Sequence, residues 1–298
     1  MPLVSENWAD LLEPGLRKIF DDSYRERASN IPVLFNVQSS SKAVEHDLTT
    51  GDILDFVPMN GAVPYDDMGQ GYKTNYTHEE YARGIKIERK LVDDDQYTII
   101  NRRPRLLALA ARRRREKDGA SMFNNAFNTA ITGGDSLSLC NSAHTSNNGG
   151  ANQSNTGTLA LTPVNLESTR RSMVGFKSDR DGIIEVMPDM ILAPLQLEET
   201  VFEIINSKGK VDTAQNNVNF HFGKYKALIW PNYLTSATRW FLLDSQMMKE
   251  FFLWFDRINP EFQKDKEFDT YQSKYSGYMR YSFGWSDWRQ WYGSAGST

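Results

Sequence analysis

The sequence is poor in the residues that build disulfide frameworks, metal centres and membrane spans. Its 298 residues include one cysteine, Cys140, which excludes an intrachain disulfide and a multi-cysteine zinc site. The four histidines, His46, His78, His144 and His221, lie far apart in sequence. No apolar run approaches the roughly 20 residues of a membrane-spanning helix. The first residues lack a basic stretch followed by an apolar one, so we expect no secretory signal.

Charge and hydrophobicity are those of a globular protein. The chain carries 34 lysines and arginines against 38 acidic residues, a formal net charge of −4, and 40% of its residues are hydrophobic. This acidic balance excludes a chain devoted wholly to nucleic-acid binding. The length predicts one large or two modest domains, which fold without disulfides or metals.

Short patterns that match catalytic or ligand-binding signatures lack the context that their chemistry needs. Gly69–Thr74 does not have the glycine and lysine spacing of a phosphate-binding loop. Ser39–Lys42 fits a serine-x-x-lysine pattern without its partner motifs, and His78–Glu80 has no second histidine for a zinc site. Cys140 and His144 lie at the edge of an Asn/Ser-rich loop, with no sign of the electropositive pocket of a reactive thiolate. We therefore expect a protein that is not an enzyme and that needs no cofactor or metal.

Residues 46–90 form the most unusual stretch. Glycines and prolines interrupt it at short intervals, at Gly51, Pro58, Gly61, Pro64, Gly69 and Gly71. Strand-like pieces at 53–57, 72–76 and 85–87 predict a long β-hairpin with a glycine-rich tip. An isolated hairpin is marginally stable in water. Because we find few large apolar residues near this tip, we expect something outside the hairpin to hold it.

The strongest helical pattern lies within 95–132. Apolar residues at three- and four-residue spacing predict a long helix that begins near Pro104 and ends before Gly133. Seven arginines and one lysine against two acids give residues 101–120 a local charge of +6. This run is either a solvated face paired with acids from elsewhere, or a phosphate-facing surface with salt-sensitive contacts that do not depend on sequence.

The second half of the chain reads as a compact α/β unit followed by an aromatic strand. Residues 141–158 predict an Asn/Ser/Gly-rich loop, and Thr162 followed by Pro163 predicts a helix start. The remaining patterns predict helices to about 175, at 197–206 and at 244–255, and strands at 183–187, 190–193, 220–222, 225–230 and 279–285.

The order of these elements resembles that of a known family. Four segments carry the match: Tyr76–Ile87, Phe123–Phe127, Leu139–His144 and Tyr281–Ser294. In this order and spacing they resemble the major capsid proteins of tailed phages of the Hong Kong 97 type, most closely the Mu-type major head subunits. The sequence departs from the family at Thr145, where a proline is usual.

The resemblance implies an α+β fold, the Hong Kong 97-like phage capsid fold. It implies five regions: an N-terminal arm at 1–45, an extended β-hairpin loop at 46–90, a peripheral domain with a spine helix and following loop at 91–161, an axial domain at 162–258, and return strands of the peripheral domain at 259–298. The extended loop would lie over a neighbouring subunit. Its expected contact residues are Gly61, Tyr65, Gly69, Gly71, Tyr72, Lys73 and Tyr76.

The implied function is structural. Copies of the chain would assemble, as hexamers and pentamers in the host cytoplasm, into the icosahedral head shell of a virion. Scaffold, portal and decoration proteins are the other candidate partners, and no membrane is involved. The spine helix would face the interior, so that Arg112, Arg113, Arg114 and Arg115 contact packaged double-stranded DNA without reading its sequence.

Two other functions stay open on the sequence. A nanocompartment shell protein of the encapsulin kind would build closed particles that contain cargo protein and no genome. An enzyme with an unrecognised site would form a small oligomer with a substrate-sized pocket.

Overall fold

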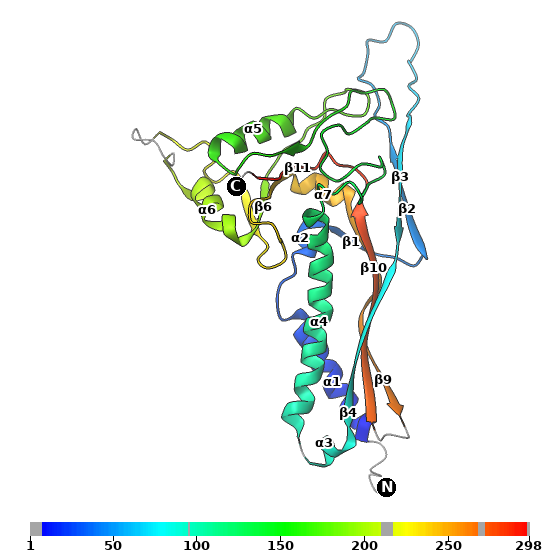
Figure 1. Ribbon diagram of the computed structural model, residues 1–298. Coiled ribbons are helices and arrows are strands. Elements are labelled where there is room, and N and C mark those ends of the chain that lie inside the picture. The colour runs from blue at the N-terminus through cyan, green and yellow to red at the C-terminus, as the bar shows by residue number, and fades with distance from the viewer. Residues whose placement is uncertain (1–7, 95, 210–216, 268–271, 297–298) are drawn as a thin grey trace.

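The computed structural model describes residues 8–94, 96–209, 217–267 and 272–296. Figure 1 shows a long limb built around one helix and a sheet, a compact unit at one end of that limb, and a hairpin that projects beside it. Among the helices of these described residues, none is both long and apolar enough to cross a lipid bilayer.

A four-stranded sheet runs along the limb. Its strand order is β1 (Asn36–Ser39), β9 (Phe252–Glu267), β10 (Gln272–Trp285) and β4 (Glu79–Glu88). β1 pairs with β9 in parallel, and the other pairs are antiparallel. Buried and half-buried residues alternate along most of β10, as expected of a strand with one face on the core. The predicted strand at 279–285 is thus confirmed, although it begins earlier.

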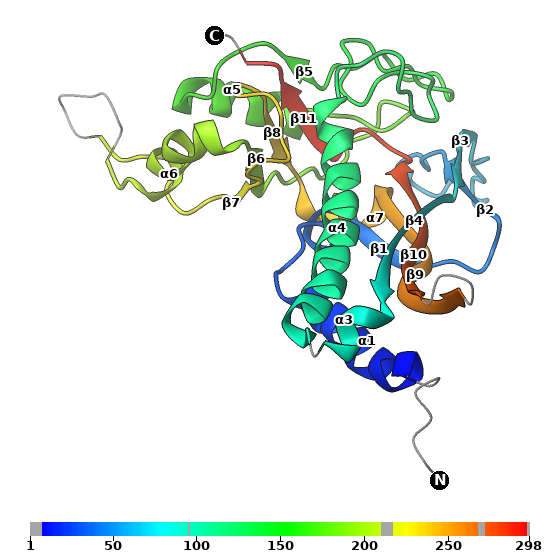
Figure 2. The same ribbon diagram turned by 60° about the horizontal axis from the view of Figure 1, so that its bottom comes forward.

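Helices cover one face of this sheet. They are α1 (Trp8–Arg25), α2 (Ile31–Leu34), α3 (Arg89–Asp93) and α4 (Tyr97–Asn124). α1 packs beside α4, and Figure 2 shows α1 and α3 together at the end of α4 farthest from the compact unit. Phe20 of α1 and Leu107 of α4 are buried there with Phe262 and Tyr275 of the sheet. The apolar positions of α1 and α4 therefore build the core of the limb.

α4 is the predicted long helix with shifted ends. It spans 28 residues, so Pro104 lies within the helix rather than in its first turn. The helix ends at Asn124, before the predicted glycine stop, and two asparagine side chains bond to backbone at this end. The Asn125 amide donates to the Ser121 carbonyl at 2.9 Å, and the Asn124 amide donates to the Tyr233 carbonyl at 2.8 Å.

The compact unit is built on a five-stranded sheet. Its strand order is β5 (Thr156–Gly157), β11 (Trp291–Ser294), β8 (Trp240–Leu243), β6 (Met190–Ala193) and β7 (Lys226–Ile229). Every residue of β6 and β8 is buried. The helical elements are α5 (Pro163–Val174), the 3-10 turn η2 (Leu195–Leu197), α6 (Glu198–Asn206) and α7 (Ser245–Phe251). Thr162 caps α5 as predicted, since its hydroxyl accepts from the Asn165 amide at 3.2 Å.

Three predictions for this half of the chain are wrong. Residues 183–187 form no strand, and Ile183 makes only an isolated bridge with Lys177. Residues 220–222 lie in a turn. The helix predicted at 244–255 ends at Phe251, because the apolar run that follows enters the core as the start of β9, with Trp254 fully buried.

The hairpin consists of β2 (Val44–Thr50) and β3 (Gln70–Thr77), paired antiparallel. Residues 51–69 connect them without forming a strand, so the strand predicted at 53–57 is wrong. The strand predicted at 85–87 lies within β4, which pairs with β10 in the long sheet rather than with the hairpin. The projecting element is therefore shorter than the predicted 46–90.

One aromatic cluster joins the limb to the compact unit. Phe123, near the end of α4, is fully buried. Its ring centroid lies 5.2 Å from that of Phe241 on β8, 5.6 Å from Phe252 on β9 and 6.4 Å from Trp291 on β11. These edge-to-face contacts make the two units share one core.

We expect Phe123→Ala to lower the free energy of unfolding by about 3–5 kcal/mol, because it leaves a cavity where three elements meet. Leu106→Ala, at an exposed position of the same helix, should change it by less than about 0.5 kcal/mol. Urea unfolding of the unassembled chain measures both values. Equal losses for the two variants would contradict the shared core.

Candidate assembly interface

The connection at the hairpin tip exposes a cluster of apolar side chains. Exposed members are Ile53, Leu54, Phe56, Val57, Met59, Val63, Tyr65 and Met68. Phe56 is fully exposed and Tyr65 is 95% exposed. The expectation that the tip has few large apolar residues is therefore wrong. Soluble monomers rarely leave large apolar patches uncovered, so the tip is a candidate interaction surface.

The same tip is acidic. Residues 51–69 contain Asp52, Asp55, Asp66 and Asp67 and no lysine or arginine. Asp66 is held by its own chain, since it accepts from the Leu54 amide at 2.9 Å and pairs with Arg180 at 2.7 Å. These two contacts lower the pKa of the Asp66 carboxyl. The tip thus offers a partner both apolar area and negative charge.

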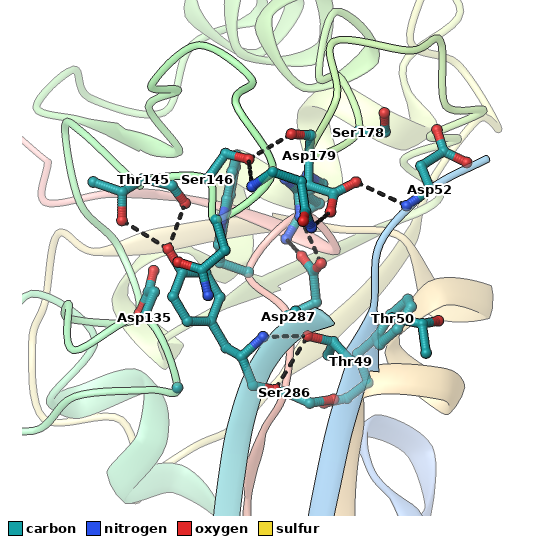
Figure 3. Close-up of a pocket in the computed structure, with 18 of the residues that line it drawn as sticks. Thr49, Thr50, Asp52, Asp135, Thr145, Ser146, Ser178, Asp179, Ser286 and Asp287 are labelled. Carbon is teal, nitrogen blue, oxygen red and sulfur yellow. Dashed lines mark hydrogen bonds and ion pairs between the residues drawn. The ribbon is translucent and has the colours of Figure 1, made fainter. Parts of the chain in front are cut away.

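The base of the tip, where the end of β2 and the start of β3 meet the connection 51–69, is fixed to the compact unit (Figure 3). The Asp52 amide donates to Asp179 at 3.0 Å, and the Tyr72 hydroxyl lies 2.9 Å from the Thr145 hydroxyl. The Tyr72 amide in turn donates to the Thr49 hydroxyl at 2.8 Å. The tip is therefore anchored by its own chain at this base, and its large apolar side chains beyond the base stay exposed.

Two glycines permit this close packing at the base. A Cβ at Gly69 would collide with the side-chain amide of Asn148, and a Cβ at Gly71 would collide with Thr49. At Gly71 the colliding atoms include the Thr49 backbone, so only glycine fits there, whereas at Gly69 they belong to the end of one side chain. Gly61 differs, because it lies at the tip with φ of +90° and nothing within 4 Å of its Cβ position.

The predicted inter-subunit residues therefore divide into two groups. Gly61, Tyr65 and Lys73 lie on exposed parts of the hairpin. Gly69, Gly71 and Tyr72 belong to the base described above, and Tyr76 is buried with its ring 5.2 Å from that of Phe255. Only the first group faces away from the body of its own chain.

The four consecutive arginines of α4 also have different surroundings. The Arg115 guanidinium is buried and binds both carboxylate oxygens of Asp256 on β9, at 2.8 and 2.9 Å. It also lies over the Trp254 ring, 5.0 Å from its centroid. The Trp254 indole N–H completes the site by donating to Asp256 at 2.9 Å. Arg115 therefore fastens α4 to the long sheet, and phosphate contact would require breaking this pair.

The other three arginines are less buried, since Arg113 and Arg114 are exposed and Arg112 is half-buried. Arg114 pairs with Asp118 at 2.9 Å and covers the Tyr81 ring at 4.6 Å. Asp118 also accepts from the Tyr281 hydroxyl at 2.6 Å, and burial raises the pKa of this carboxyl. Arg112 donates to the Ala28 carbonyl. Arg113 is exposed, so it is the member of the run best placed to meet a ligand.

Sequence reasoning missed the arrangement of the other basic residues on α4. Arg102, Arg113 and Lys117 are exposed and follow each other at spacings of eleven and four residues. Such spacings place side chains on one face of a helix. The helical period was the signal that could have separated this exposed stripe from the buried Arg115.

Cys140 and His144, the residues nearest to a catalytic pattern, serve the packing of loops. The His144 ring lies 2.6 Å from Asp135 and 3.1 Å from the Asn155 amide oxygen, and it stacks on Trp288 with centroids 4.4 Å apart. Cys140 is buried, and burial raises the pKa of its thiol. A reactive thiolate needs the opposite shift.

A family model described as phage capsid protein matches residues 71–294. No curated protein matches the chain. Several solved structures share its fold. The decorated capsid of bacteriophage JBD30 has a TM-score of 0.56 and 12% identity, covering 69% of this chain and 90% of that chain. The JBD30 procapsid has the same score and identity, with coverage of 97% and 75%. The Microbacterium phage Oxtober96 structure has a TM-score of 0.56 and 9% identity, with coverage of 91% and 92%.

Arg115→Gln should lower the free energy of unfolding by about 3–5 kcal/mol, because it leaves Asp256 buried and unpaired. Arg113→Gln, two residues earlier and exposed, should change it by less than about 0.5 kcal/mol. Thermal or urea unfolding of the unassembled chain compares them. A result in which both variants match the wild-type protein would remove the structural role of Arg115.

Proposed function

This chain belongs to the phage capsid protein family, and we propose that it is the major head subunit of a tailed phage. As a capsid protein it is a structural subunit of a shell. We further propose that copies assemble as hexamers and pentamers into an icosahedral head around double-stranded DNA. The observation that carries the proposal is the bare, acidic and apolar hairpin tip, which its own chain anchors at the base and leaves uncovered at the end.

In this proposal the fold is of the Hong Kong 97 type, closest to the Mu-like group. α4 would be the spine helix of the peripheral domain, with β9 and β10 as the return strands beside it. The unit built on the five-stranded sheet would be the axial domain, and α1 would belong to the N-terminal arm. The extended loop would be the hairpin Val44–Thr77, with β4 counted in the peripheral sheet because it pairs with β10.

One groove of the chain has the chemistry to receive the tip of another copy. It runs between α4, β4 and β10, with Leu107, Ala111 and Met279 in its apolar lining. Arg83, Arg113 and Arg114 also line it, against the one acid Glu80, so the groove carries net positive charge. The tip cannot enter the groove of its own chain, because its base is fixed and it extends away from α4 and β4 (Figure 1). The occupant is therefore a second copy, and closure of a shell multiplies this contact.

Replacing Phe56 and Tyr65 together by serine should prevent shell formation and leave the thermal unfolding of the chain unchanged, since neither side chain belongs to its core. Electron microscopy and sedimentation distinguish closed particles from small oligomers. Leu106→Ser, at an exposed apolar position on α4, is the control and should still assemble. Shells at the wild-type yield from the double variant would refute the docking role of the tip.

Charge reversal tests the groove itself. Asp55→Arg with Asp67→Arg should reduce assembly, and Arg83→Asp should do the same, because each places like charges together. Mixing the two variants should restore mixed particles, since opposite charges then face each other across half of the contacts. Two defective variants that stay defective together would place the tip on a different surface.

The exposed stripe of α4 would contact packaged DNA. Arg102, Arg113 and Lys117 carry three positive charges on one helix face, in a chain whose net charge is negative. Binding to phosphates by such side chains releases counterions and weakens with salt. The stripe is proposed in place of the four consecutive arginines, because Arg115 is withdrawn from that run by its pair with Asp256.

Changing Arg102, Arg113 and Lys117 to glutamine should weaken DNA retention in intact shells, more at low salt than at high salt. The slope of log affinity against log salt should fall by about 1 for each phosphate that the variant no longer binds. Lys226→Gln, an exposed cation on β7, is the control. Intact shells with unchanged retention would exclude the stripe as a DNA contact.

A further inference from the structure

A buried histidine lies where the hairpin leaves the long sheet. His78 is the residue between β3 of the hairpin and β4 of the sheet, and it is 5% exposed. Ser40, which directly follows β1, lies in the other crossing, where the chain passes from the sheet to β2. The His78 ring contacts Ser40 and also Ser282 on β10. One imidazole therefore connects both roots of the hairpin to the body of the protein.

The hydrogen bonds around this ring fix its tautomer. The Ser40 hydroxyl donates its one proton to the Glu45 carboxylate at 2.7 Å and accepts from the Lys42 amide at 3.2 Å. It must then accept from His78 Nε2–H, at 3.1 Å. Nδ1 consequently carries the lone pair and accepts from the Ser282 hydroxyl at 3.0 Å. The hydrogen bonds therefore run in one direction, with Ser282 donating to His78, His78 to Ser40 and Ser40 to Glu45.

The charged groups that face the ring favour its neutral form. Arg257 on β9 and Arg280 on β10 lie on the sheet side, where Arg280 is 3.6 Å from Glu80 of β4. Glu45, paired with Lys42 at 3.0 Å, lies on the hairpin side. Burial, followed by the charge of Arg280, lowers the pKa of His78, and the opposing effect of Glu45 is smaller. A proton on Nδ1 would force the Ser282 hydroxyl to turn and accept, and it would add a positive charge on the side where the two arginines lie.

We propose that His78 is a positioning residue that, together with the contacts at the base of the tip, fixes the angle at which the hairpin leaves the long sheet, and that protonation of its ring weakens this attachment. The neutral ring satisfies one donor and one acceptor from two different strands. The protonated ring carries two donors and a charge that faces two arginines. The conformational claim does not depend on the proposed function, whereas its consequence for assembly rests on that function.

The direction of the pH effect follows from the lowered pKa. We call the hydrogen-bonded arrangement of the neutral His78 ring the latch, and the state without it the released state. In the released state the ring has the ordinary histidine pKa of about 6.5, so below that pH it binds more protons than in the latched state. The latch is therefore at full strength above about pH 6.5 and weakens as the pH falls from there toward the lowered pKa of the latched ring. Assembly contacts made by the hairpin would weaken over the same interval.

Hydrogen–deuterium exchange on the unassembled full chain tests the latch. Between about pH 7.5 and about pH 5.5, and after correction for intrinsic rates, protection of β2 and β3 should fall by up to about tenfold relative to α5, which is the limit that one histidine with a released-state pKa of about 6.5 sets. His78→Gln keeps a donor and an acceptor without titrating, so its hairpin should stay protected at both pH values. Ser282→Ala should be weakly protected at both. His46→Gln, on the exposed face of β2, is the control and should behave like the wild-type protein.

Three results would overturn the proposal: a pH response of His78→Gln equal to that of the wild-type chain, an equal loss of protection in α5, or ring nitrogen NMR signals that show an Nδ1–H tautomer. The NMR measurement uses the wild-type protein, so it decides the matter even if a variant fails to fold. Normal shell assembly by Ser282→Ala with a loosened hairpin would count against the proposed docking of the tip and leave the latch intact.

Discussion

The attachment of α4 to the long sheet is the contact on which the other parts of the structure depend. The Arg115–Asp256 pair fixes α4 to β9 in the middle of the limb, and Phe123 fixes the end of the same helix against β8, β9 and β11. A buried ion pair is stable only when both partners keep their hydrogen bonds, so it specifies one register between helix and sheet. That register also places Asp118 and Tyr281 within hydrogen-bond distance.

Local chemistry explains which elements could be predicted. Thr162 and Pro163 form a cap and first turn that any helix would use. The alternation of aromatic and small or polar residues along 279–285 predicted a strand, which β10 confirms, although its regular burial pattern breaks between Tyr281 and Ser282. The apolar run from Phe252 gave no such period, because a strand buried on both faces has the same composition as a buried helix. Only tertiary packing decides between them.

The sequence predicted that a hairpin forms the candidate interface, but not which residues anchor it. The glycines and the alternating residues predicted a hairpin whose end is not covered by its own chain. The residues that anchor this hairpin are Thr145, Asp179 and Arg180, which lie about 70 to 130 residues away in sequence and match no motif. The same holds for Asp256, which is separated from Arg115 by 141 positions. A run of arginines in the sequence shows only the local charge. Which of these arginines is exposed to solvent depends on the packing of the folded chain.

The burial of Cys140 leaves the surface of this protein without a reactive thiol of its own, since the sequence contains no other cysteine. A single cysteine placed at Tyr65 would therefore be the one accessible attachment point for a spin label, a fluorophore or a bifunctional crosslinker. Distances measured from that position would chart the neighbourhood of the hairpin tip in solution and in assembled particles, with no background from the native chain.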